Sequence, residues 1–339
     1  MPGIKSLRRI QIGAEDVATH GTAVAATTFM RLNGVLDDQR VVTFPVEDIG
    51  ILVGADRNYT SKLLGEIQMT GPATFEQLPY ILETIVHATP TTDTGSGTGY
   101  IREYIFPTLS TDIPESTDYV TYTIEGGDNQ EAESMEYSFV PSFKLSGTPT
   151  EAWMVDATWR GRQVSTDTFT GLGTSDIPTV DEMLFSKTSL YIANSSTDWG
   201  SAISQTLLGA TLDVDTGLRD VYTADGQLYF SFIKNVGATA TLYITFEHNA
   251  TAQAQKAIWR AKTTKSIRLA VTGSALTAAG AYTYRTVYID MAGKWEKFEK
   301  LSEQDGNDIV AGIFRVRYNT SAVGEYLKFT IVNELATLP

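Results

Sequence analysis

A regular alternation of apolar and polar residues constrains the fold of this 339-residue chain more than any other feature. Within Thr239–His248, every second residue from Ala240 to Phe246 is apolar, and most of the residues between them are polar. Leu208–Asp215 and Trp153–Arg160 show the same period of two. This period puts one face of an extended strand on a core and the other toward water. The chain is therefore predicted to be mainly β, with antiparallel sheets packed as a sandwich.

Two segments are predicted to be helical. Ala73–His87 follows a Gly-Pro pair, which is typical of a helix start, and contains Pro79, which should kink or split the helix. Thr251–Lys262 follows Asn249, a suitable N-cap, and is rich in Ala, Gln and Lys.

The order of these elements indicates a duplication. In each half an alternating strand leads into a helix, further strands follow, and a strand pair closes the unit. From helix start to closing pair there are 61 residues in the first half (73 to 134) and 57 in the second (251 to 308). A Ser-, Thr-, Gly- and Pro-rich stretch lies between the halves. We predict a β domain over residues 1–168, a linker over 169–186 and a second β domain over 187–339, each a sandwich or barrel with one flanking helix.

The net charge of −14 disfavours tight binding to nucleic acid, which needs Lys and Arg against phosphates. The charge is uneven, since residues 1–170 carry 23 acidic and 11 basic side chains and the rest carry 17 and 15. No Lys or Arg occurs between Glu103 and Lys144. That acidic stretch is interpreted as a solvated loop or as a surface that repels another polyanion.

Few residues here are suited to chemistry. Cysteine is absent, which excludes disulfides and thiolate sites, and the three histidines (His20, His87 and His248) do not have the spacing of metal ligands. We find no phosphate-binding Gly-Lys-Ser/Thr motif and no G-x-S-x-G turn. We therefore predict no catalytic, cofactor or metal site, and no enzyme activity. No apolar run is long enough to cross a bilayer, so no membrane partner is predicted.

Three phrases of the chain carry a family resemblance. The segment Gly13–Asp38 contains a G-x-E-x-x-x-x-x-G-T-A pattern, the segment Gly71–Val86 contains the first predicted helix, and Ser146–Val164 contains a Trp-Arg-Gly-Arg phrase near its end. The pattern is made by Gly13, Glu15, Gly21, Thr22 and Ala23. Together the phrases resemble the tail tube proteins of long-tailed, siphovirus-type bacteriophages.

The resemblance implies a structural virion protein. Copies would form rings whose strands close into one barrel around a lumen, and the rings would stack into the hollow tail through which DNA reaches the host. A two-domain chain would need three copies for a pseudo-sixfold ring. The implied partners are further copies, the tape measure protein, the tail terminator, distal tail proteins and the viral DNA, which passes through without tight binding. The implied location is the virion tail, assembled in the host cytoplasm.

Two sets of residues are candidates for these roles. Strands with a polar face are expected to line the lumen, where acidic groups would repel DNA phosphates. The candidates for the lumen wall are Thr211, Asp213, Asp215, Thr241, Thr245 and Glu247. The loop between two strands near residues 45–58 is expected to be a hairpin arm that contacts a neighbouring ring. The candidates for that arm are Pro45, Glu47, Asp48, Asp56 and Arg57.

Other interpretations stay open. The composition also fits a phage baseplate or capsid decoration protein. A carbohydrate-binding β-sandwich would account for the β content and the spread of aromatic residues. A hydrolase would need two carboxylates brought together by the fold.

Overall fold

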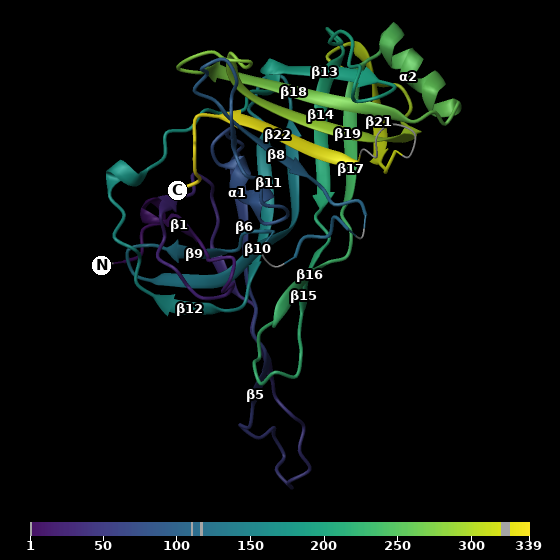
Figure 1. Ribbon diagram of the computed structural model, residues 1–339. Helices are drawn as coiled ribbons and strands as arrows, with labels where there is room; N and C mark the ends of the chain where they lie inside the picture. Colours follow the sequence, from purple (N-terminus) through teal and green to yellow (C-terminus); the bar gives the residue numbers. More distant parts are fainter. Residues whose placement is uncertain (1, 110, 116–117, 320–325) are drawn as a thin grey trace.

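The computed structural model describes residues 2–109, 111–115, 118–319 and 326–339 (Figure 1). Strands hold 47% of the residues and helices 8%, which confirms the prediction of a mainly β protein. In the described part of the chain, no helix is both long and apolar enough to cross a membrane.

The main sheet is a single antiparallel layer that runs through both halves of the chain. Its strands, in spatial order, are β3 (Leu36–Asp38), β6 (Gly65–Pro72), β11 (Met154–Gly161), β10 (Ala132–Gly147), β14 (Leu207–Asp215), β17 (Thr239–Glu247), β21 (Asn307–Val316) and β19 (Tyr284–Phe298). The short strand β20 (Ser302–Gln304) pairs with the end of β21. The predicted strands at 208–215, 239–248 and 153–160 are all present, because their apolar faces share one core.

Two long strands leave the main sheet and continue into two smaller sheets. The first half of β10 lies in a sheet with β2 (Thr28–Phe29), β1 (Arg9–Ala14), β9 (Tyr122–Gly127) and β12 (Val164–Asp167). The first half of β19 lies in a sheet with β13 (Thr188–Ala193), β18 (Lys265–Ala275), β22 (Leu327–Asn333), β8 (Tyr100–Ile105) and β7 (Thr91–Thr92). Bulges let each long strand bend from one sheet into the other. Among the described strands, no chain of pairings returns to its starting strand, so the sheets stay open within one chain.

Two hairpins extend from the lower end of the main sheet (Figure 1). One is formed by β4 (Val41–Thr43) and β5 (Tyr59–Lys62), and it projects far from the body. The other is formed by β15 (Leu218–Val221) and β16 (Phe232–Asn235).

The prediction was accurate for one helix and too long for the other. Helix α2 (Ala250–Arg260) is where it was predicted, and the Asn249 side chain accepts hydrogen bonds from the amides of Thr251 and Ala252. Helix α1 is only Leu78–Glu83, so the predicted helix at 73–87 was too long. Residues 73–75 are bound elsewhere, since the Ala73 amide donates to Trp153 O and the Phe75 amide donates to Asp181 O.

The stretch predicted as a linker is attached to the first half. The Met183 amide donates to Ala73 O at 2.9 Å, the Trp153 amide donates to Met183 O at 2.7 Å, and the Phe185 amide donates to Glu151 O at 3.0 Å. Three short 3₁₀ helices lie at Lys5–Leu7, Thr174–Asp176 and Phe185–Lys187.

The acidic stretch between Glu103 and Lys144 is not simply a loop, which corrects the first interpretation. Its later part forms β9 and most of β10, and Glu125 is buried. Glu125 accepts hydrogen bonds from the amide and the hydroxyl of Thr170, at 2.7 and 2.5 Å. Residues 110, 116 and 117 of this stretch lie outside the described residues.

Glu15, from the first of the family-like phrases, is a buried structural carboxylate. It accepts hydrogen bonds from the Gly21 amide and the Thr121 hydroxyl, both at 2.7 Å. It also accepts one from the amide of Tyr137 at 2.7 Å, and Tyr137 has a φ of 55° at the bulge of β10. Glu15 therefore holds β1, β9 and the bend of β10 together.

Candidate assembly edges

The strand order of the first half recurs in the second half. In the main sheet, β3–β6–β11–β10 is followed by β14–β17–β21–β19. In the smaller sheets, β1–β9–β10–β12 matches β13–β18–β19–β22. Each half has one hairpin between its first two main-sheet strands and one helix after the second. The two halves therefore share one topology.

The pairing registers match the two halves residue by residue. Arg160 lies opposite Glu66, and Arg315 lies opposite Thr241. Likewise, Asp37 is opposite Glu66, and Asp213 is opposite Thr241. After the third strand, the Arg162 amide donates to Glu136 O at 3.0 Å, and the Arg317 amide donates to Ala292 O at 2.8 Å. Residues that hold the same place in these two sets are called counterparts below, such as Asp37 and Asp213 or Arg162 and Arg317.

The two halves meet at the pairing of β10 with β14, here called the internal junction. Residues 142–147 pair with residues 210–215. On the buried side, Leu145 lies opposite Leu212, and both are fully buried. On the polar side, the Lys144 ammonium is 3.8 Å from the Asp213 carboxylate. The Thr216 amide and hydroxyl both donate to Pro141 O at 3.0 Å. The junction thus combines main-chain hydrogen bonds with core packing.

The first outer edge of the main sheet is β3, which pairs with β6 alone among the described strands. The Asn33 amide donates to Thr70 O of β6, and the Gln39 amide donates to Leu64 O just before β6, both at 2.8 Å. Since antiparallel strands alternate their bonding direction, the amides of Gly34, Leu36 and Asp38 point away from β6. This edge is the counterpart of the β14 edge that is occupied in the internal junction.

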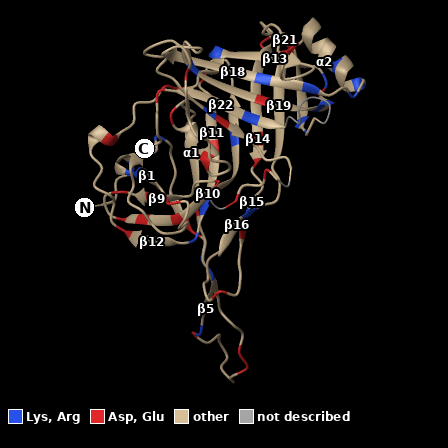
Figure 2. Ribbon diagram, viewed as in Figure 1, with Lys and Arg blue, Asp and Glu red and all other residues tan. Residues whose placement is uncertain are grey.

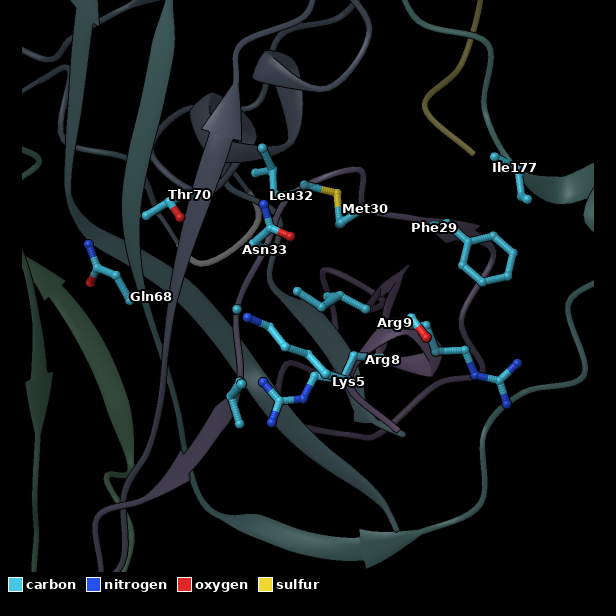
Figure 3. Close-up of a pocket in the computed structure, with 14 residues that line it drawn as sticks. Lys5, Arg8, Arg9, Phe29, Met30, Leu32, Asn33, Gln68, Thr70 and Ile177 are labelled. Carbon is cyan, nitrogen blue, oxygen red and sulfur yellow. The ribbon is translucent and has the colours of Figure 1, made fainter. Parts of the chain in front are cut away.

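A groove of about 660 Å³ lies beside this edge (Figure 3). Polar and apolar side chains contribute about equally to its lining, and Lys5, Arg8 and Arg9 supply positive charge. The Arg9 guanidinium stacks 3.8 Å above the Phe169 ring. No acidic residue lines the groove, whose described lining is Lys5, Ser6, Arg8, Arg9, Ile10, Phe29, Met30, Leu32, Asn33, Gly34, Val35, Gln68, Thr70 and Ile177.

The second outer edge is the end of β19 with the residues that follow it. Phe143 and Phe298 are counterparts, because they lie opposite Ala157 and Gly312 in the matched strands. Residues 297–302 are therefore the counterpart of residues 142–147. In the described structure they bond to β21 on one side, and no described strand lies on the other. The Trp259 indole of α2 donates to Glu296 O at 3.0 Å just before this segment.

The predicted lumen residues lie together on the polar face of β14 and β17. The register places Asp213 beside Thr241 and Asp215 beside Thr239. Thr211, Thr245 and Glu247 continue the same face by alternation. Thr241 is buried and accepts a hydrogen bond from Arg315 at 3.0 Å.

The acids of this face have basic neighbours that the sequence analysis missed. Arg219 donates to both carboxylate oxygens of Asp215, at 3.0 and 2.6 Å. Partial burial raises the pKa of Asp215, but these bonds, the Gly217 amide and the Arg219 charge outweigh it, so the pKa lies below its usual value. Arg160 bonds to Glu66 at 3.0 Å. Figure 2 shows both signs of charge interspersed along the main sheet. The alternation in β11 could have placed Arg160 on this face, whereas no local pattern marks Arg219, which lies in β15.

The predicted arm residues lie at and near the tip of the β4–β5 hairpin. Asp48, Asp56 and Arg57 are exposed, while Pro45 and Glu47 are partly exposed. Glu47 forms an ion pair with Arg57. The tip also presents apolar side chains to solvent, since Val46 and Leu52 are fully exposed.

Among the described residues, no group of three or more His, Asp or Glu side chains is placed to hold a metal ion. The most buried carboxylate near a histidine is Glu83, which bonds to His87 Nδ1 at 2.5 Å and accepts from the Tyr104 hydroxyl at 2.8 Å. Comparison of the chain with protein-family models and with curated proteins finds no match.

Proposed function

We propose that this protein is a self-assembling structural subunit whose copies join edge to edge into rings, and that the rings stack into the tail tube of a long-tailed bacteriophage. The observation that carries the proposal is the internal junction. One half of the chain already binds the other through an edge, and no described strand pairs with the counterparts of these edges at the two ends of the same sheet.

In the proposed contact, residues 297–302 of one copy pair with the β3 edge of the next. The groove beside β3 is the place that the end of β10 fills in the internal junction, so the turn after β19 enters it. The segment after β19, made of β20 and the turn that follows it, carries Glu303 and Asp305, and the groove carries Lys5 and Arg8, so the charges are complementary. Edge strands with free amides and carbonyls are sites for strand addition.

Such a contact joins two different surfaces, so it repeats from copy to copy and closes into a ring or continues as a filament. With two matched halves in each chain, three copies give a ring of six units. This is the ring that the family resemblance implies. The polar face of the main sheet then lines the lumen, and its mixed charges keep DNA from binding tightly. The implied tape measure, terminator and distal tail partners are part of the same proposal.

Electron microscopy of the purified chain in negative stain tests the proposal. We expect hollow rings or tubes with threefold or pseudo-sixfold symmetry as the concentration rises. A chain that stays monomeric at every concentration, even with the initiator proteins of its phage, would contradict the proposal.

A variant of the free edge tests the mode of joining. Asp38→Pro removes an amide that points away from β6, so the monomer should keep its fold while ring formation is lost. Asp38→Asn is the matched control, since it removes the same charge but keeps the amide. Rings formed equally well by both variants would exclude pairing through β3.

One difference between the two junctions gives a second test. The counterparts of Lys144 and Asp213 are Glu299 and Asp37, which are both acidic, so the contact between copies lacks the ion pair of the internal junction. Opposed like charges destabilise strand pairs. Glu299→Lys should therefore lower the concentration at which rings form, and Lys187→Glu, a charge change elsewhere on the exposed surface, should not.

A further inference from the structure

The two hairpins occupy matched positions in the two halves. The β4–β5 hairpin spans the 24 residues between Gln39 and Leu64, and the β15–β16 hairpin spans the 23 residues between Asp215 and Thr239. Both hairpins leave the main sheet at the same end. The first connects β3 to β6, and the second connects β14 to β17. They are therefore two versions of one element in two surroundings.

The second hairpin is docked against the first half of its own chain. Phe230 is fully buried, with its ring centroid 5.1 Å from that of Tyr137 and 5.8 Å from that of Phe139. The Arg162 guanidinium donates to Phe230 O at 3.3 Å and to Ser231 O at 3.1 Å.

The surface of the first half that binds this hairpin is here called its foot, and it includes Leu63, Tyr137, Phe139 and Arg162. Leu228 O accepts a hydrogen bond from the Leu63 amide at 2.9 Å. Leu218 and Ile233 of the hairpin are buried as well. The foot of one half thus binds the hairpin of the half next to it through a guanidinium and a main-chain bond.

No described segment covers the first hairpin in this way. Its exposed apolar side chains are Val41, Val42, Phe44, Val46, Ile49, Ile51, Leu52, Val53 and Tyr59. Figure 1 shows the hairpin projecting away from the rest of the protein. An apolar surface of this extent on one element marks a site of interaction.

The foot of the second half holds an open cavity where the first half holds a hairpin. Arg317 is the counterpart of Arg162, and Ala238 is the counterpart of Leu63. Both line a cavity of about 360 Å³, together with Tyr318 and Tyr326. The second half therefore has the features of a hairpin-binding foot, and no hairpin formed by the described residues occupies it.

Charge favours the same pairing. Counting back from the matched positions Leu63 and Ala238, Asp56 of the first hairpin is the counterpart of Ser231, which lies against Arg162. A hairpin docked in the same way would bring Asp56 to Arg317. Arg315 also lines the cavity, but its guanidinium is paired with Glu296 at 2.7 Å, so Arg317 supplies the positive charge. In the hairpin, Glu47 is paired with Arg57, which leaves Asp48 and Asp56 as the excess negative charge.

We infer that the β4–β5 hairpin of one copy docks into the cavity around Arg317 and Ala238 of a second copy. The inference rests on the proposed edge-to-edge assembly, because the same neighbour that pairs with β3 presents this cavity. The hairpin then binds the adjacent copy within a ring, whereas the sequence alone suggested an arm between rings.

A charge exchange tests the contact. Arg317→Asp and Asp56→Arg should each raise the concentration needed for half-assembly by roughly five- to tenfold, as loss and reversal of one partly exposed ion pair would. The double variant restores opposite charges and should recover most of the loss. Lys187→Asp is the control for net charge. Sedimentation velocity over a concentration series measures all four.

Cross-linking gives an independent measurement, because the chain has no cysteine of its own. An equimolar mixture of Asp56→Cys and Arg317→Cys chains should form a disulfide-linked pair under mild oxidation, and Asp56→Cys mixed with Lys187→Cys should not.

The outcomes separate the two proposals. Rings that form normally with Arg317→Asp, or equal cross-linking in both mixtures, would overturn the hairpin contact and leave edge pairing intact. A wild-type chain that never assembles would overturn both.

Discussion

The two hairpins of this protein hold the same place in their halves but lie in different surroundings. The β15–β16 hairpin buries Leu218, Phe230 and Ile233 against a neighbouring half, while the β4–β5 hairpin leaves its apolar residues in solvent. The difference is one of position in the sheet, since only the second half has a neighbour on that side within the chain. The same structural element is therefore buried or exposed according to whether the chain supplies a neighbouring half for it.

The largest difference is expected from the buried aromatic residue of the second hairpin. Phe230→Ala should lower the free energy of unfolding by about 3–5 kcal/mol, because it leaves a cavity between Tyr137 and Phe139. Phe44→Ala, at a side chain that is 66% exposed in the first hairpin, should change monomer stability by less than about 0.5 kcal/mol. Urea unfolding of both variants measures the contrast, and equal losses would refute it.

A smaller difference is expected between the two counterpart arginines. Arg162→Met should cost about 1–3 kcal/mol of monomer stability, since two carbonyls of the hairpin lose their charged donor. Arg317→Met should cost little in the monomer and act on assembly instead. The comparison fails if the Arg317 variant destabilises the monomer as much as the Arg162 variant does.

The two helices offer a pH-dependent contrast. The hydrogen bond with Glu83 is the largest cause that raises the pKa of His87 above its usual value. A raised folded-state pKa means that the contact stabilises fully below the unfolded pKa and is lost as pH rises through the folded pKa. We expect a modest loss of thermal stability across that window, because His87 is half exposed. His87→Gln should remove it, while His248→Gln, beside α2, should leave it unchanged.

The smallest effect is expected at the polar side of the internal junction. Lys144 and Asp213 are 3.8 Å apart and both partly exposed, so Lys144→Ala should cost at most about 0.5 kcal/mol. Leu145→Ala on the buried side of the same strand should cost about 2–5 kcal/mol. Chemical denaturation compares the two faces, and a large Lys144 effect would show that charge, more than packing, holds the halves together.

Sequence patterns predicted the strands well where one face is buried and one is wet. The alternation in β14 and β17 marked both their extent and the shared face of Asp213 and Thr241. The pattern was less informative where residues are captured by distant segments. Thr74 bridges to Glu182, so the residues before α1 do not extend the helix that their propensity favours.

The candidate site shows the same limit. The arm at 45–58 was predicted because it lies between two predicted strands. The hairpin at 218–235 was not recognised as its counterpart, because local sequence patterns do not show which hairpin packs against a neighbouring half. The basic groove beside β3 gathers Lys5 and Arg8 from one segment and Gln68 from another. Such gathering depends on strand order across the whole sheet.

The sequence by itself determined that this protein is mainly β, with two helices and a repeated order of elements, because period and propensity act over a few residues at a time. Tertiary structure alone decided that β10 joins β14, that Arg162 holds a hairpin while Arg317 faces a cavity, and that two sheet edges have no partner among the described strands. These depend on which distant strands share a register, and a pairing register is set by core packing over the whole molecule.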